Sequence, residues 1–171
     1  MTTHWALPEN LLPSSVEIMR RPGSFGNEGL VLWLGRRRAD ATTVEVTHIV
    51  EVHGPGLKTS PLHLSLSHAA LNALDELAES LGVYLVGQIH SHPRTFTDLS
   101  DLDKISGIRV QDFVSVVCPH YAQQRRTAWA ECGIHLFDAG CYRRLGAGDV
   151  RQRVTTTKHT APVVQLEVDD D

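Results

Sequence analysis

Apolar residues recur along the chain with two periods, one typical of helices and one typical of strands. The clearest helical segment lies between Ser67, a plausible N-cap, and Gly82, which closes the C-terminal end. One face of this predicted helix carries Leu71, Leu74, Leu77 and Leu81. A shorter helix is predicted around Glu9–Arg20, ahead of a stretch rich in proline and glycine, and a third over Ser100–Ile105.

Strand-like segments lie between these helices. Residues 29–35, 83–90 and 112–118 are largely apolar, as buried strands are, whereas 42–52 and 161–168 alternate between apolar and polar positions. Residues 125–138 supply one or two more strands. Strands interleaved with a few helices predict an α/β or α+β domain in which a single mixed sheet is flanked by one long helix and shorter helices.

The length favours a single domain. The chain has 171 residues, enough for one hydrophobic core and too few for two ordinary domains. Neither internal repeats nor a linker divide it, so residues 1–171 are predicted to form one unit. The final residues, EVDDD, are expected to be a frayed acidic tail.

Composition excludes several classes of partner. The formal net charge of −4 does not favour nucleic acid, and no apolar run approaches the roughly 20 residues of a membrane span. The first residues lack the basic and apolar segments of a secretory signal, and three cysteines do not suggest a disulfide framework. Reduced thiols in the cytoplasm are therefore expected. A metal site formed by Cys118, His120 and Cys132 lacks a CxxC pair to support it.

The segment GQIHSHPRTFTDLSDLD, residues 87–103, is the candidate for chemistry. Side chains two apart on a strand share a face, so His90 and His92 are expected to present both imidazoles to one side. Pro93 ends the strand, and the loop 93–99 is long enough to bring Asp103 back as a third ligand. Zinc takes about four ligands of these types, one of them water at a catalytic site.

Spacing alone leaves other interpretations open. A pair of histidines one residue apart arises easily in a chain with ten histidines. Ser100 and Asp103 also fit a capping box, which needs no metal. Both roles are compatible, because Ser100 can begin a helix while Asp103 faces inward from its first turn.

The wider pattern resembles the JAMM motif of the MPN+ (JAB-domain) zinc metalloproteases: HxH, seven residues, Ser, two residues, Asp. His90-Ser91-His92-Pro93 and Ser100-Asp101-Leu102-Asp103 match this spacing, and Glu28 precedes an apolar strand as the family's glutamate does. By itself, Glu28 would be an exposed carboxylate on a turn rich in glycine and asparagine. The resemblance covers roughly residues 10–140. It implies an MPN/JAB, cytidine-deaminase-like architecture in a small, prokaryotic-type member.

The resemblance also implies an activity. Zinc would be held by His90, His92 and Asp103, Glu28 would act as general base and then general acid, and Ser100 would donate a hydrogen bond to the oxyanion. The expected reaction is hydrolysis of a peptide or isopeptide bond after the C-terminus of ubiquitin or a ubiquitin-like protein. The alternative is a non-catalytic MPN scaffold, which would be expected to lack ligands that are present here. Nothing in the sequence indicates an oligomeric state.

Overall fold

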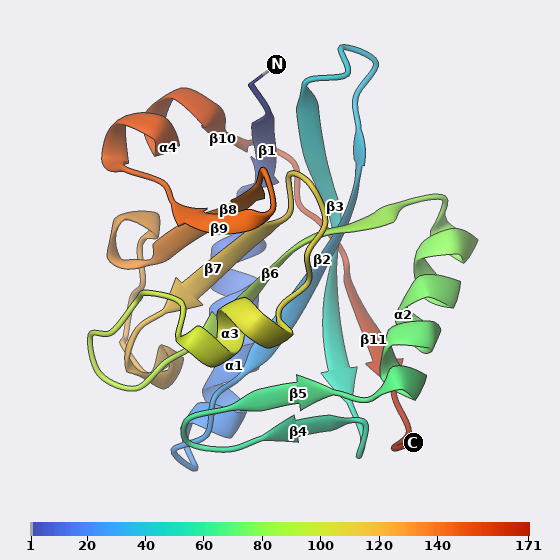
Figure 1. Ribbon diagram of the computed structural model, residues 1–171, viewed down its shortest axis with the longest axis vertical. Helices are drawn as coiled ribbons and strands as arrows, with labels where there is room; N and C mark the ends of the chain where they lie inside the picture. The colour runs from blue at the N-terminus through green and yellow to red at the C-terminus, as the bar shows by residue number, and fades with distance from the viewer. Residues whose placement is uncertain (1) are drawn as a thin grey trace.

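In residues 2–171, which the computed structural model describes, a curled, nine-stranded mixed sheet organises the chain together with four α-helices (Figure 1). The strand order is β10-β1-β3-β2-β6-β7-β8-β9, and β11 pairs with the second half of β3. The strands of the sheet are β1 (His4–Pro8), β2 (Leu30–Arg37), β3 (Thr43–His53), β6 (Tyr84–Ser91), β7 (Val114–Cys118), β8 (Gly133–Asp138), β9 (Cys141–Arg144), β10 (Val154–Thr157) and β11 (Val163–Glu167). A separate hairpin consists of β4 (Leu57–Thr59) and β5 (Leu64–Leu66). The helices are α1 (Leu11–Gly23), α2 (His68–Leu81), α3 (Asp101–Ser106) and α4 (Ala147–Arg153). The predicted class, a mixed sheet flanked by helices, is confirmed.

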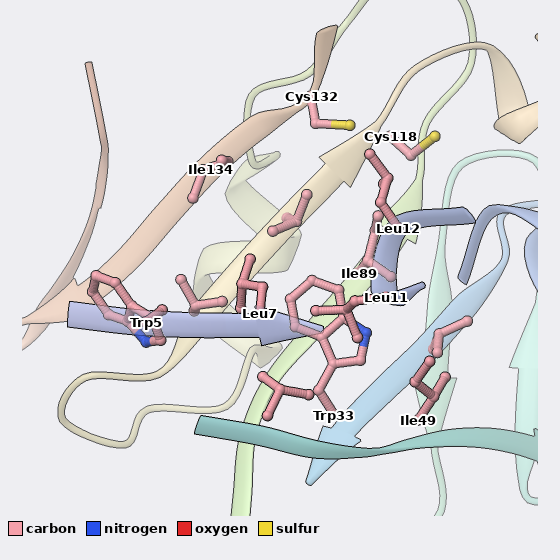
Figure 2. Packing of buried hydrophobic residues seen from close by; sticks show 14 of the residues in the cluster. Trp5, Leu7, Leu11, Leu12, Trp33, Ile49, Ile89, Cys118, Cys132 and Ile134 are labelled. Carbon is pink, nitrogen blue, oxygen red and sulfur yellow. The ribbon is translucent and has the colours of Figure 1, made fainter. Parts of the chain in front are cut away.

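Strand β2 is apolar on both faces because each face is covered by a different helix. Val31 and Trp33 belong to the core under α1, and the alternate residues Leu30, Leu32 and Leu34 belong to the core under α2. The core under α1 is shown in Figure 2, where Trp33 lies close to residues of α1 and β1. The indole Nε1 of Trp33 donates a hydrogen bond to Ser15 on α1 at 3.1 Å, so the one polar atom of this large side chain is satisfied.

Helix α2 confirms the predicted cap residues and part of the predicted apolar face. The Ser67 hydroxyl accepts a hydrogen bond from the Ala70 amide, and Gly82 adopts the left-handed conformation at φ 64°. The buried residues are Ala70, Leu74 and Ala78, whereas Leu71 and Leu81 are exposed. Leu74 is shared with the predicted line of leucines, and Ala70 and Ala78 take the places expected for Leu71 and Leu81 in the buried stripe.

Replacing Ser67 with alanine is expected to lower the free energy of unfolding by about 1 kcal/mol, because the Ala70 amide loses its capping acceptor. Chemical denaturation would measure the change. Ser80→Ala is the matched control, since the exposed Ser80 hydroxyl donates to a carbonyl near the other end of the same helix. Equal losses in the two variants would contradict a capping role for Ser67.

The acidic C-terminal tail is ordered against α2, so the prediction of a frayed end is wrong. The Asp171 carboxylate accepts hydrogen bonds from the backbone amides of His68 and Ala69 at 3.1 and 2.8 Å. Lys58 forms an ion pair with Asp170 at 2.9 Å. Unpaired amides at a helix N-terminus attract a carboxylate, which explains why this polar segment docks there.

Five short strands and one short α-helix are absent from the sequence-based prediction: β1, β4, β5, β9, β10 and α4. Each has at most seven residues, and β1 and β10 are parallel strands at one end of the sheet, where pairing with β3 and with each other defines them. Such pairing leaves little periodicity in the sequence. Among residues 2–171, no helix is both long enough and apolar enough to cross a membrane.

Candidate metal centre

The end of strand β6 places two imidazoles on the same side of the sheet, as the alternation predicts. His90 and His92 are both buried, with 1% and 3% of their surface exposed. Their Nε2 atoms lie 3.0 Å apart. Ser91, between them, points the other way, and its hydroxyl accepts a hydrogen bond from the Gly29 amide at 2.9 Å.

Helix α3 brings Asp103 to these histidines through a capping box. The backbone amide and the hydroxyl of Ser100 each donate to Asp103 Oδ2 at 2.7 Å, and the Asp103 amide donates back to Ser100 Oγ at 3.1 Å. The pair is therefore a helix cap and also a candidate part of the metal site: Ser100 begins the helix, and Asp103 faces inward toward the histidines. The predicted oxyanion donor, Ser100 Oγ, is bonded to Asp103 in this structure.

Three possible metal-ligand atoms lie close enough together to share one ion. Asp103 Oδ2 lies 3.2 Å from His92 Nε2 and 3.6 Å from His90 Nε2, which with the 3.0 Å between the two nitrogens gives a compact triangle. Donors bound to one tetrahedral zinc at 2.0–2.2 Å lie about 3.3–3.6 Å from one another, and the sides of the triangle are within about 0.3 Å of that range. Within residues 2–171, this is the one group of three His, Cys, Asp or Glu side chains close enough to share a metal. Cys118, His120 and Cys132 do not form another.

Burial and neighbouring charges favour the protonation states that bind a metal. Burial lowers the pKa of His90 below its usual value, although Asp103 opposes the shift, and this direction favours the neutral imidazole. Burial alone would raise the pKa of Asp103, but His90, His92 and the Ser100 hydroxyl outweigh it and hold that pKa well below its usual range. Neutral imidazole and ionised carboxylate are the forms that ligate zinc.

Glu28 lies beside the triangle and is buried, not exposed on a turn. Only 3% of its surface is exposed, and its Oε1 is 3.9 Å from His92 Nε2. Burial raises the pKa of Glu28 to about 7, although the nearby His92 opposes this shift. A carboxyl with a pKa near neutrality can both accept and release a proton, as general acid–base chemistry requires.

Backbone contacts fix the position of Glu28 relative to the histidines. The Glu28 amide donates to the Ser60 carbonyl at 2.9 Å, and the Ser91 amide donates to the Gly29 carbonyl at 3.0 Å. A Cβ at position 29 would come within 2.8 Å of the Met19 Cβ on α1. Glycine therefore lets the segment that carries Glu28 pass close to the helix.

Two features of the site are missing from the sequence-based prediction. Phe96, in the loop 93–99, stacks on His92 with ring centroids 5.5 Å apart and planes at 6°. His120, Tyr121 and Ala122 form a turn with three consecutive positive φ angles of 56°, 51° and 59°. The Tyr121 amide in this turn donates to the His92 carbonyl at 2.9 Å. No glycine or asparagine marks the turn, so the sequence gives no signal for it.

Comparison with known proteins supports the fold. No family model matches the chain, and no curated protein matches it. Among solved structures, it is similar to the solution structure of protein DSY2949 from Desulfitobacterium hafniense, with a TM-score of 0.63 and 18% identity. That similarity covers 91% of this chain and 94% of the other. The mixed α+β fold is thus shared with a solved protein over nearly the whole length of both chains.

Proposed function

We propose that the chain is a zinc-dependent isopeptidase or peptidase of the JAMM/MPN+ type, with the corresponding MPN/JAB architecture. Its substrate would be ubiquitin or a ubiquitin-like protein, cleaved after its C-terminus in deconjugation or precursor processing. The observation that carries the proposal is the buried donor triangle of His90, His92 and Asp103 with the Glu28 carboxylate beside it.

The surrounding residues suit hydrolysis. A zinc ion held by the three donors would act as a Lewis acid and lower the pKa of a bound water to about 7. Glu28 would take up a proton on its carboxylate and return it to the leaving amine. The Ser100 hydroxyl, by turning away from Asp103, would donate to the oxygen of the scissile carbonyl as negative charge develops there.

A groove beside the ligands suits an extended peptide. A cavity of about 180 Å³ runs between β5 and the end of α3, and its lining includes His90, Asp103, Leu64 and Leu66. In the described residues, β5 pairs only with β4, so its other edge is free to accept a further strand. The flexible C-terminal tail of a ubiquitin-like substrate could add to this edge through main-chain hydrogen bonds. Its last peptide bond would then lie at the proposed metal ligands.

Apolar side chains around the site favour a protein substrate over a free peptide. Leu62 lies in the β4–β5 turn, Phe96 in the loop 93–99, and Leu102 and Ile105 on α3, and all four are exposed, by 75%, 53%, 45% and 69%. Clustered exposed apolar residues typically mark interaction surfaces. They would contact the folded part of a ubiquitin-like protein while its tail occupies the groove.

The direct test is cleavage by the zinc-loaded chain, followed by intact mass spectrometry. One substrate is a ubiquitin-like protein with a short C-terminal peptide extension, and the other is the same protein joined to a lysine side chain. We expect at least one to be cut after the C-terminal residue of the ubiquitin-like protein, with activity lost on chelation and restored by Zn²⁺.

An unrelated folded protein with the same extension is the substrate control and should remain intact. Binding of the ubiquitin-like protein without cleavage, by a chain carrying about one zinc, would instead support the alternative of a non-catalytic MPN scaffold.

A further inference from the structure

Helix α3 carries a proposed ligand, yet none of its six residues is buried. A helix this short is not stable alone, and without a buried face it gains little from packing. The position of Asp103 must therefore depend on contacts made on either side of α3. This raises the question of which residues hold the helix against the sheet.

On its N-terminal side, the loop 93–99 is fastened to strand β8. His135 Nε2 lies 2.8 Å from Asp98 Oδ1, and because the carboxylate only accepts, this nitrogen is the donor. His135 is 2% exposed, and Asp98, whose side chain is half exposed, lies between the imidazole and solvent. Leu99, the next residue of the loop, is also buried.

The backbone of this loop fits closely against β8 and β9. A Cβ at Gly133 would lie 1.8 Å from the Thr97 carbonyl oxygen, so only glycine allows the loop to approach this near. Arg144 on β9 donates to the Thr97 hydroxyl at 3.0 Å and lies 3.6 Å from Asp98. The Asp98–His135 bond is thus one of several contacts that join the loop 93–99 to strands β8 and β9.

On its C-terminal side, the Arg109 guanidinium donates to two carbonyls of α3, and Tyr142 links the chain to β9. The Tyr142 hydroxyl donates to the Ile108 carbonyl, just after the helix. Strands β8 and β9 therefore hold the chain on both sides of α3, and Asp98 lies five residues before Asp103.

We propose that His135 and Asp98 are positioning residues that hold Asp103 in the metal-binding triangle. This inference rests on the proposed zinc centre. Without the Asp98 carboxylate, the loop loses its bond to the buried imidazole, and the carboxylate of Asp103 is no longer confined near His90 and His92. The protein would then bind zinc with two fixed ligands and one mobile ligand.

The test compares zinc affinity in three variants, measured by competition with a chelator of known affinity. Asp98→Ala is expected to raise the Kd for Zn²⁺ about tenfold, the lower end of what losing a supporting contact costs. Asp98→Asn keeps an oxygen acceptor for His135 and should remain within about threefold of the unchanged chain. Asp101→Ala removes an exposed carboxylate from α3 itself and controls for the loss of negative charge.

Hydrogen exchange of the metal-free protein gives a second readout. Amides of residues 100–106 are expected to exchange faster in Asp98→Ala than in Asp101→Ala. If Asp98→Ala and Asp101→Ala have equal Kd values for Zn²⁺ and equal exchange of these amides, the positioning role of His135 and Asp98 is wrong. The proposed zinc centre would be unaffected by that result. An unchanged chain that binds no zinc would contradict the metal centre, and with it the role assigned to His135 and Asp98.

Discussion

Glu28→Gln is expected to bind zinc as tightly as the unchanged chain and to hydrolyse its substrate at least a hundredfold more slowly. Glutamine has nearly the same shape and keeps the buried position, but it cannot take up a proton. General acid–base catalysis typically contributes 10²- to 10⁴-fold, which sets the expected loss. Zinc content and the rate of tail cleavage, measured on the same preparation, give both quantities.

Glu51→Gln is the matched control, because Glu51 lies on β3 and pairs with His53, away from the donor triangle. It should leave both zinc content and rate unchanged. Full activity in Glu28→Gln would show that another group handles the proton. Loss of zinc in that variant would show that Glu28 is a ligand, which its 3.9 Å distance from His92 Nε2 does not indicate.

His92→Ala is expected to remove both the metal and the activity. The substitution removes one of the three proposed ligands, and His90 and Asp103 alone do not complete the site. About one zinc per chain after gel filtration should fall to nearly none, and the rise in Tm that zinc gives the unchanged chain should disappear, since stabilisation requires binding to the folded state.

His159→Ala controls for the removal of a histidine, because His159 is exposed and its ring contacts Thr157 only through Nδ1. It should keep the zinc and the shift in Tm. If neither His92→Ala nor the unchanged chain binds zinc, even after zinc is supplied, Ser100 and Asp103 serve as a helix cap and the protein is a binding module.

The three proposed ligands were predictable because local rules place them. The two-residue period of a strand puts His90 and His92 on one side, and a capping box turns Asp103 inward from the first turn of α3. Glu28 was different, because nothing local marks it as buried. It came from the resemblance, and its position depends on the pairing of Leu30 with His90 between β2 and β6.

The residues that support the site were not predictable, because each acts through a contact distant in sequence. His135 and Asp98 are 37 positions apart; His135 lies in no motif, and Asp98 is one of the unspecified loop positions between His92 and Ser100. The buried face of α2 was partly misplaced for the same reason. Which side of a helix is buried depends on the sheet it meets, and here Ala70 and Ala78 join Leu74 on the buried side while Leu71 is exposed.

The contact between Ser91 and Gly29 also sets the order in which the centre can assemble. These residues are 62 positions apart, so the bond that sets Glu28 beside the histidines closes a long loop of chain. Closing such loops costs entropy and delays folding, whereas the capping box around Asp103 forms locally. The three proposed ligands, by contrast, all lie within residues 90–103 and need no such long loop to meet. We infer that the ligands can come together before Glu28 is set beside them, so that the placement of Glu28 completes the centre.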